Sequence, residues 1–402
     1  MKFLHTADWH LGKLLVDRSR LKEQKKVLHY IVELVRKHEV DVIGIAGDIY
    51  DNGNPSAAAV ELFCDTVHQI AQNGKRLVVI IAGNHDKPER LTGLLPLAKS
   101  QGIVIIGTPT EEIESGRYGD YQVKSLGRGC FEVEIKGETV RFGCLPYTSE
   151  KSLGEVFYQD ITNEESHLKS YEEKMASLYE EIDRHYREDT INILMSHVFT
   201  AGYEGDKSER STQLGGSYLL QSFVFPKKAD YIALGHVHKP QTVGGTEKRA
   251  RYSGAILPYH SDEIKTPKQC NLVTFEDGKR IKTESLLLPD PKPIERWFCN
   301  SYEEAVAKCT ENAERECWVF LTIRLITPLL EDQIRKLKEI KADILEIVPD
   351  FSGKDRTEEE REQLRQEENV IALFRQFYES SGRGKPNPEM MKLLAELTEE
   401  EE

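Results

Sequence analysis

Short uninterrupted runs of apolar residues recur along the first two thirds of the chain. Five of them lie shortly before acidic, amide or imidazole side chains, and they read KFL, VIGIA, VVIIA, INILM and YIAL. Runs of this length and composition are typical of strands that are covered on both faces. Residues 21–38 and 56–73 instead place apolar side chains at helical spacing. Strands that alternate with amphipathic helices predict an α/β fold.

The same pattern predicts two local features within this region. The residues KGET at 136–139 separate two strand-like runs and indicate a hairpin. A highly charged stretch at 163–187 precedes the fourth apolar run, and we expect it to form an exposed helix outside any binding site.

The periodicity changes after the proline-rich stretch LLLPDPKP at 286–293. The segments IERWFC, SYEEAVAKC, WVFLTIRL, LLEDQIRKL and ADILEIVP then alternate between strand-like and helix-like patterns, which predicts a small α+β module. Beyond it, two apolar stripes at helical spacing predict two short amphipathic helices. The stripes contain Leu364, Ile371, Phe374 and Tyr378, and then Met390, Leu393, Leu394 and Leu397. We therefore expect three segments, at 1–285, 286–350 and 351–402.

Side chains able to bind metal ions follow the five apolar runs in five clusters. The clusters contain Asp8 and His10; Asp48 and Asp51; Asn84, His85 and Asp86; His197; and His236 and His238. Residues two apart in an extended chain point to the same side, so the members of the first and fifth clusters can converge. Loops that follow the strands of an open α/β sheet gather at its carboxyl edge. We therefore expect all five clusters to meet at that edge.

The donor set predicts divalent cations and phosphoester chemistry. Carboxylate, amide and imidazole donors without a thiolate suit Mn²⁺ or Mg²⁺, and Fe²⁺ and Zn²⁺ remain alternatives. Two cations about 3.5–4 Å apart can stabilise both the attacking and the leaving oxygen of a phosphoryl displacement. The clusters therefore predict a two-metal site that hydrolyses phosphoesters.

Each cluster taken alone also has a structural interpretation. Asp48 and Asp51 could cap the helix that follows them, and Asn84 and Asp86 could form turns. Paired histidines are harder to explain by packing, because two buried imidazoles need separate hydrogen-bond partners. Seven other histidines match no ligand position, and we interpret them as structural or surface residues: His5, His29, His38, His68, His167, His185 and His260.

Three basic residues closely follow the first, third and fifth clusters: Lys13, Arg90 and Lys239. They could contact phosphate groups near the metal ions. For any one of them, however, the pattern favours a solvated loop charge, and contact with phosphate is the alternative.

Together, the motifs DWHLGK, AGDIYD, AGNHD, SH and GHVHKPQ resemble those of the calcineurin-like metallophosphoesterases, and within that family those of the SbcD-type nuclease subunits. The resemblance covers residues 1 to about 260. It implies a β-sandwich flanked by helices. It also implies a small α+β capping domain at 286–350 and a helical, partner-binding tail at 351–402.

The resemblance further implies a role for each clustered residue. The two ligand sets would be Asp8, His10, Asp48 and His238 for the first ion, and Asp48, Asn84, His197 and His236 for the second. Asp48 would bridge the ions, because a shared anion offsets the repulsion between two close cations. His85 would be the catalytic acid, and Asp51 would orient it.

For function, the resemblance implies a Mn²⁺-dependent DNA nuclease that works with an SbcC-type coiled-coil ATPase. Such an enzyme would be an ATP-dependent double-strand exonuclease and a hairpin-opening endonuclease in DNA repair, recombination and replication. Two nuclease chains, as a homodimer, would join two ATPase chains in a heterotetramer. The sequence has no P-loop motif GxxxxGK[ST], so any ATP dependence must come from the partner.

Charge and cysteine content add three expectations. The chain has 54 Lys and Arg against 68 Asp and Glu, a net charge of −14. Because duplex-binding proteins usually carry a basic face, we expect the chain alone to bind DNA weakly. Seven scattered cysteines without a CxxC pair fit reduced thiols. There is no room for a signal peptide before Asp8 and no apolar run of membrane-spanning length, so we expect a cytoplasmic protein that binds no membrane.

Two other classes of function stay open at this point. A free-standing metallophosphatase or cyclic-nucleotide phosphodiesterase would use the same metal cluster. The helical tail and the SbcD-like sequences of the first and fifth clusters argue against this alternative. A non-catalytic scaffold would be expected to have lost ligands, whereas every position is filled. The α+β module could also be a stabilising domain only, and the tail stripes could pack on the chain's own core.

Overall fold

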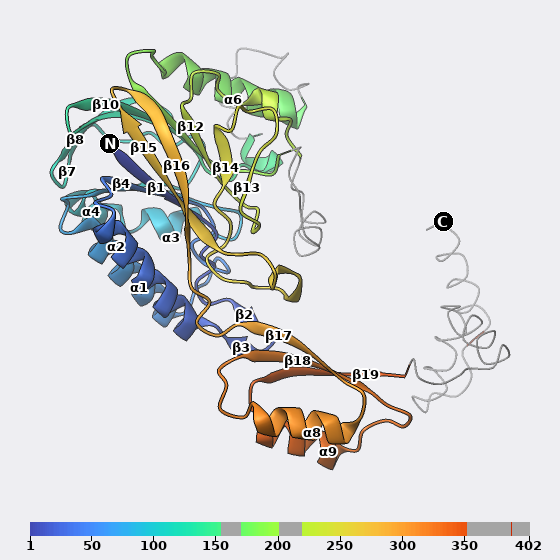
Figure 1. Ribbon diagram of the computed structural model, residues 1–402. Coiled ribbons are helices and arrows are strands. Elements are labelled where there is room, and N and C mark those ends of the chain that lie inside the picture. Colours follow the sequence, from blue (N-terminus) through green and yellow to red (C-terminus); the bar gives the residue numbers. More distant parts are fainter. Residues whose placement is uncertain (154–169, 201–218, 352–386, 388–402) are drawn as a thin grey trace. The chain divides into compact units, whose positions relative to one another are not determined.

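The computed structural model describes residues 1–153, 170–200, 219–351 and 387 of the 402-residue chain (Figure 1). The chain divides into two compact units. The first contains residues 1–295 and 315–319, and the second contains residues 296–314 and those from 320 onward. The first unit carries all five predicted clusters.

Two large sheets form the first unit. The strand order is β16-β15-β1-β4-β5-β6 in the six-stranded sheet and β13-β14-β12-β11-β10-β9-β8-β7 in the eight-stranded sheet. Strands β1, β4, β5 and β6 run parallel, as do β10, β11, β12 and β14. The first sheet contains β1 (Lys2–Thr6), β4 (Val42–Ala46), β5 (Leu77–Ile81), β6 (Ile103–Ile106), β15 (Gln269–Glu276) and β16 (Lys279–Leu287). The second contains β7 (Gly116–Tyr118), β8 (Tyr121–Gly127), β9 (Cys130–Ile135), β10 (Glu138–Leu145), β11 (Ile191–His197), β12 (Tyr231–Gly235), β13 (Gln241–Thr242) and β14 (Ala250–Tyr252).

Helices cover the outer faces of the two sheets (Figure 1). The six-stranded sheet is covered by α1 (Leu21–Lys37) and α2 (Ala57–Ala71), and the eight-stranded sheet by α6 (Tyr171–His185). The shorter elements are β2 (Leu14–Leu15), β3 (Arg18–Ser19), α3 (Pro88–Thr92), α4 (Leu95–Ala98), η1 (Lys99–Gln101), η3 (Ser222–Val224) and η4 (Ser261–Glu263).

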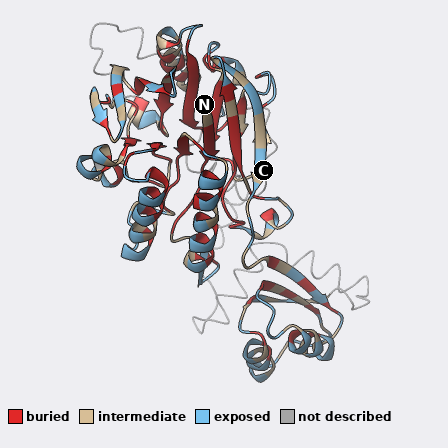
Figure 2. Cartoon of the chain, turned by 60° about the vertical axis from the view of Figure 1, so that its left-hand side comes forward, coloured by how far each residue is buried: buried red, intermediate tan, exposed pale blue. Residues whose placement is uncertain are grey.

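The hydrophobic core follows these layers. Phe3, Phe142 and Tyr231 are fully buried between the two sheets. Ile31 of α1 and Phe63 of α2 are buried on the faces of these helices that pack against the six-stranded sheet. Figure 2 shows burial concentrated in the strands, with the outer faces of the helices exposed. The first unit is thus a helix–sheet–sheet–helix sandwich, which confirms the predicted α/β sandwich.

The local sequence explains why these elements form where they do. The buried residues of α1 from Val27 to Val35 fall on one face at helical spacing. The Ser56 side chain accepts a hydrogen bond from the backbone N–H of Ala59 and so caps α2. The predicted hairpin joins β9 to β10, and Lys136 and Gly137 both have positive φ, as a tight hairpin turn requires.

Helix α6 corrects one expectation. It is the described part of the charged stretch at 163–187, of which residues 163–169 lie outside the described residues. One face of α6 buries Met175, Leu178, Tyr179 and Ile182 against the eight-stranded sheet, so it is a covering helix and not a fully exposed one. The charge pattern hid this face, because its apolar residues are outnumbered by acidic and basic neighbours.

The sequence predicted that the five ligand-bearing strands belong to one sheet. The structure divides them between two sheets. Strands β1, β4 and β5 lie in the six-stranded sheet, and β11 and β12 lie in the eight-stranded sheet. The sheets approach closely near these strand ends. A Cβ atom added to Gly235 would lie only 1.7 Å from the Ala46 carbonyl oxygen, so no side chain fits there. Periodicity identifies strands but not the sheet to which each belongs, which is why the sequence missed this division.

The second unit has the predicted order of strands and helices. Its elements are β17 (Ile294–Cys299), α8 (Tyr302–Glu311), β18 (Trp318–Arg324), α9 (Glu331–Ile340) and β19 (Ile344–Asp350), although the first two residues of β17 and of β18 are grouped with the first unit. The three strands form one sheet in the order β17-β18-β19, with both helices on one of its faces (Figure 1). The α+β module is therefore confirmed.

The two apolar stripes predicted beyond this unit, at 364–378 and 390–397, lie outside the described residues. In the part of the chain that the structure describes, no helix is long and apolar enough to cross a bilayer.

Candidate metal centre

The five clusters meet at the carboxyl ends of β1, β4, β5, β11 and β12. The imidazole nitrogens His10 Nε2 and His238 Nε2 lie 3.0 Å apart although 228 residues separate them in sequence. On the other side, Asn84 Oδ1 lies 3.0 Å from His197 Nε2 and 2.9 Å from His236 Nδ1. Tertiary structure thus brings together every residue that the sequence predicts as a ligand.

Asp48 lies between the two groups. Its Oδ2 atom is 3.5 Å from both His10 Nε2 and His197 Nε2. Its Oδ1 atom accepts a hydrogen bond from the backbone N–H of His85 at 2.9 Å. Asp48 is therefore placed to serve both groups with one oxygen while the other is held by the backbone.

We call Asp8, His10 and His238 the first half of the centre, and Asn84, His197 and His236 the second half. The ligand atoms of the first half all lie within 4.8 Å of one another. The same limit holds for a set that joins Asp8 and Asp48 to His197. The two halves are therefore adjacent and linked through carboxylates.

The backbone at several of these residues is not extended, which corrects the geometric basis of the prediction. Asp8, His10, Asp48 and His236 have φ values of 52°, 45°, 50° and 100°. Positive φ is uncommon for residues other than glycine and costs on the order of 1–3 kcal/mol each. The side chains converge because the strand ends turn sharply, and not because alternate residues of a strand share a face.

Glycines before the ligands allow this crowding. A Cβ atom on Gly83 would lie 2.1 Å from Asp48 Oδ1, and one on Gly47 would lie 2.1 Å from His197 Nδ1. Larger residues at either position would collide with the ligand side chains. The recurrent AGD and AGN motifs therefore reflect close approach at the centre.

The residues present fit a pair of divalent cations. Asp8 Oδ2 and His10 Nδ1 are buried and have no hydrogen-bond partner among the described residues. Burial raises the pKa of Asp8 to about 7, although the His197 and His238 imidazoles oppose this rise. Burial would also raise the pKa of Asp48, but the His197 and His10 imidazoles hold it well below its usual value. Buried carboxylates facing imidazole nitrogens fit the donor set of a divalent-cation site.

His85 and Asp51 lie beside the first half. The His85 ring is edge-on to the His10 ring, with centroids 4.8 Å apart. His85 Nδ1 lies 2.7 Å from the backbone carbonyl oxygen of Asp51, which accepts the hydrogen bond. The Asp51 carboxylate instead accepts a hydrogen bond from Lys13 Nζ at 2.7 Å. The orienting group for His85 is thus the backbone of Asp51, whereas the sequence suggested its side chain.

Asp86 has a structural role in the third cluster. Its carboxylate accepts hydrogen bonds from the backbone N–H groups of Gly83, Ile49 and Tyr50 at 2.8–3.1 Å. These bonds tie the loop after β5 to the loop after β4. Asp86 therefore positions the loops that carry Asp48 and His85.

The basic residues and the remaining histidines near the centre have other partners. Lys13 pairs with Asp51, and Arg90 Nη2 donates to Asn54 Oδ1 at 2.7 Å. Both nitrogens of His5 are satisfied, by Tyr231 Oη at 3.0 Å and by the Leu234 carbonyl oxygen at 3.1 Å. His5 is therefore structural, in agreement with its exclusion from the ligand set.

Sequence reasoning missed a buried ion pair behind the first half. Glu263 is fully buried, and its Oε1 atom lies 3.2 Å from His238 Nδ1. Lys268 Nζ lies 2.5 Å from Glu263 Oε2 and donates to the His238 carbonyl oxygen at 3.0 Å. Burial alone would raise the pKa of Glu263, but Lys268 and His238 lower it to about 2. The only sequence signal was a charged residue in the loop after the fifth cluster, which is too common to be informative.

An aromatic side chain flanks the second half. The Tyr147 ring is stacked beside the His236 ring, with centroids 6.4 Å apart, and meets the His197 ring edge-on at 6.3 Å. Tyr147 follows β10, so a sixth strand end contributes to the centre. Tyrosine is not among the ligand types that the five clusters share, and the sequence therefore did not indicate it.

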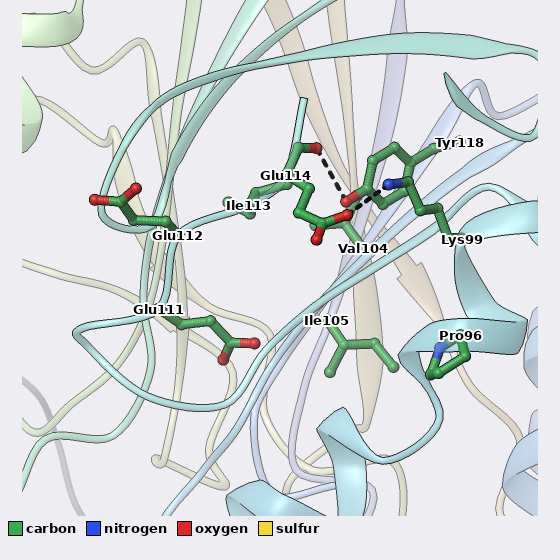
Figure 3. A pocket seen from close by; sticks show the side chains of 9 residues that line it. All are labelled: Pro96, Lys99, Val104, Ile105, Glu111, Glu112, Ile113, Glu114 and Tyr118. Carbon is green, nitrogen blue, oxygen red and sulfur yellow. Dashed lines mark hydrogen bonds and ion pairs between the residues drawn. The ribbon is translucent and has the colours of Figure 1, made fainter. Parts of the chain in front are cut away.

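A separate pocket of about 310 Å³ lies away from these residues (Figure 3). Glu111, Glu112 and Glu114 line it, and its one lysine, Lys99, is already paired with Glu114 at 2.8 Å. An anionic phosphoester would be repelled there. The metal centre, and not this pocket, is the candidate site for phosphoester chemistry.

Comparison with known proteins agrees with this chemistry. A family model described as calcineurin-like phosphoesterase matches residues 1–240. The SbcD component of the SbcCD nuclease from Bacillus subtilis (strain 168) is 36% identical over 401 residues, which cover 99% of this chain and 97% of that protein.

Two solved structures were also matched. One is a dimetal phosphatase from Danio rerio, with 13% identity, a TM-score of 0.36, and coverage of 72% of this chain and 99% of that one. The other is an archaeal phosphodiesterase, with 11% identity, a TM-score of 0.28, and coverage of 71% and 100%. Scores this low add nothing to the argument.

Proposed function

The chain belongs to the calcineurin-like phosphoesterase family, and we propose that it is the nuclease subunit of an SbcCD-type complex. It is a metal-dependent phosphodiester hydrolase. In the complex it acts on DNA as an ATP-dependent double-strand exonuclease and as an endonuclease that opens hairpins. These activities serve DNA repair, recombination and replication.

The observation that carries this proposal is the extent of the match to the Bacillus subtilis protein. The family model ends at residue 240, whereas the similarity to that protein runs over 99% of the chain. It therefore includes the α+β unit and the region beyond it, which a free-standing phosphatase would not need. This extent favours the nuclease over the phosphatase or cyclic-nucleotide phosphodiesterase alternative.

Two divalent ions are assigned to the centre, with Mn²⁺ as the first choice and Mg²⁺ as the second. The ligand sets are Asp8, His10, Asp48 and His238 for the first ion, and Asp48, Asn84, His197 and His236 for the second. When bound, the ions supply electrostatic stabilisation of the attacking and leaving oxygens. The position of Asp48 Oδ2, equally far from His10 and His197, supports a bridging role.

His85 is assigned as the group that handles the leaving-group proton. A backbone carbonyl can only accept a hydrogen bond, so His85 Nδ1 must carry the hydrogen that it shares with Asp51. In the doubly protonated ring, His85 Nε2 also carries a hydrogen, and it can deliver that proton to the leaving oxygen or stabilise the charge on it. The backbone N–H of His85, held by Asp48, fixes the distance between this group and the metal ligands.

The other segments receive supporting roles. The α+β unit is the capping domain, which helps to seat DNA, and the tail from residue 351 binds the coiled-coil ATPase. Two nuclease chains and two ATPase chains form the working assembly. A partner would also explain how a chain with a net charge of −14 approaches a polyanion.

The test is Mn²⁺-dependent cutting of a hairpin duplex by the chain with and without the coiled-coil ATPase. His85→Ala is compared with wild type, and His29→Ala, an exposed histidine on α1, serves as the matched control. We expect cutting that needs Mn²⁺ and the partner, is lost in His85→Ala and is kept in His29→Ala.

Failure to cut any DNA in the assembled complex, with metal bound, would overturn the nuclease assignment. Rapid turnover of small phosphoesters by the chain alone, together with that failure, would favour the phosphatase alternative.

A further inference from the structure

The buried ion pair of Glu263 and Lys268 contacts His238, a predicted metal ligand, at both its ring and its backbone. Glu263 Oε1 lies 3.2 Å from the ring nitrogen His238 Nδ1, and Lys268 Nζ donates to the carbonyl oxygen of the same residue at 3.0 Å. The two charged groups meet at 2.5 Å and are 0% and 5% exposed. Ring and backbone of His238 are thus held by one ion pair.

Burying such a pair is not expected to add stability by itself. Moving a carboxylate and an ammonium out of water costs several kcal/mol each, and well-packed apolar residues often do as well or better. A buried pair that touches a functional residue therefore calls for a role beyond packing.

The contact sets the hydrogen position on His238. An ionised carboxylate only accepts hydrogen bonds, so His238 Nδ1 must carry the hydrogen. The bare lone pair is then on Nε2, which faces His10 Nε2 at 3.0 Å. Carboxylates that accept from a metal-binding histidine fix its ring and make its other nitrogen more basic.

The second half has no charged counterpart to this arrangement in what the structure describes. His197 Nδ1 is held at 2.9 Å by the backbone carbonyl oxygen of Ala46. A neutral carbonyl fixes the ring equally well, but it polarises the imidazole less than a carboxylate does. The two halves are therefore expected to differ in how strongly they bind a cation.

We propose that Glu263, held in place by Lys268, is a positioning residue that sets the affinity of the first half for its divalent ion. The inference rests on the proposed two-metal centre. Of the two ions, the one held by Asp8, His10 and His238 is then bound more tightly. Part of that higher affinity comes from Glu263, which is not itself a ligand.

The test is calorimetric titration of the full chain with Mn²⁺. Wild type, Glu263→Gln and Glu263→Ala are compared, and Glu132→Gln is the matched control because it breaks a carboxylate–guanidinium pair with Arg141 that joins β9 to β10. We expect the tighter affinity to fall about 10- to 100-fold in Glu263→Ala and less in Glu263→Gln, which keeps an acceptor without its charge. The weaker affinity and the control should not change.

Lys268 left alone in the core could unfold the single variants. The double variant Glu263→Gln, Lys268→Met removes both charges, so no unpaired charge is left in the core. We expect this variant to fold, and its Mn²⁺ affinities can then be compared with those of wild type. Nitrogen-15 spectra of labelled histidines add a readout that a purely structural role would not move, since His238 should lose its fixed Nδ1–H form in Glu263→Ala.

Unchanged Mn²⁺ affinities in folded Glu263 variants would overturn this inference and leave the nuclease proposal intact. The converse is also distinguishable. A wild-type chain that binds two ions and shows the Glu263 effect, but cuts no DNA in the complex, would overturn only the nuclease proposal.

Discussion

The two halves of the metal centre are held in place by different means. In the second half, His197 sits at the end of β11 and donates to the backbone of β4, so the sheets themselves fix the ring. In the first half, His238 depends on Glu263 and Lys268, which lie 25 and 30 residues later in the sequence. One half is positioned by secondary structure and the other by a buried ion pair. Positions of the first kind follow from strand patterns, whereas positions of the second kind appear only in the folded chain.

The largest effect is expected at the residue that the two halves share. Asp48→Asn keeps the shape of the side chain but removes the charge that lies 3.5 Å from an imidazole nitrogen of each half. We expect both Mn²⁺ affinities to fall and cutting to drop by at least about 1,000-fold, because the ligands act as a unit. Calorimetry and a cutting assay measure this. Loss of only one ion would show that Asp48 belongs to one half.

His85→Ala should separate chemistry from metal binding. His85 donates its backbone N–H to Asp48, a contact that alanine keeps, while its ring handles the proton. We expect cutting to fall about 100- to 10,000-fold, the usual contribution of general acid catalysis, with both Mn²⁺ affinities retained. A parallel loss of metal binding would instead make His85 a ligand.

His5 is a buried histidine that bonds a backbone carbonyl and has no assigned metal role, and its burial should make the stability of the chain depend on pH. Burial lowers the pKa of His5 to about 3, compared with 6.5 in the unfolded chain. Below pH 6.5 the unfolded chain therefore binds a proton that the folded chain does not, and stability falls by about 1.4 kcal/mol per pH unit down to the folded pKa.

We expect His5→Gln, although less stable at neutral pH, to lose stability less steeply between pH 6.5 and 3.5, by about one proton. Urea unfolding of the chelator-treated protein at a series of pH values measures the slope. An unchanged slope would mean that His5 titrates normally in the folded state.

The smallest effect is expected for Asp51→Asn. The backbone carbonyl that holds His85 Nδ1 survives this change. What is lost is the ion pair with Lys13 and the charge that lies 3.9 Å from His10 Nδ1. Partly exposed ion pairs contribute about 0–1 kcal/mol, so we expect cutting to change by less than about fivefold and the pH optimum to stay the same. A drop as large as that of His85→Ala would show that the carboxylate, and not the backbone, orients the histidine.

The sequence predicted the strands and clusters well because both depend on local patterns. The strand runs before Asp8, Asp48, Asn84 and His197 were identified by their continuous apolar residues, and the helices by their spacing. The division of these strands between two sheets was missed, since pairing partners lie far apart in sequence. The positive φ values at Asp8 and His10 were missed as well, because strand ends were assumed to stay extended.

The supporting residues of the centre were also beyond the sequence. Glu263 and Lys268 look like ordinary surface charges until the fold buries them. Whether Asp51 used its carboxylate or its backbone could not be read from residue type. Such contacts depend on where loops from distant segments meet.

We propose that this chain holds two divalent ions where its two sheets meet. Crystals grown with Mn²⁺ and measured at the manganese absorption edge would locate them. We expect two anomalous peaks, one among Asp8, His10 and His238 and the other among Asn84, His197 and His236, with Asp48 between them. A single peak, or none at these residues, would contradict the two-metal assignment.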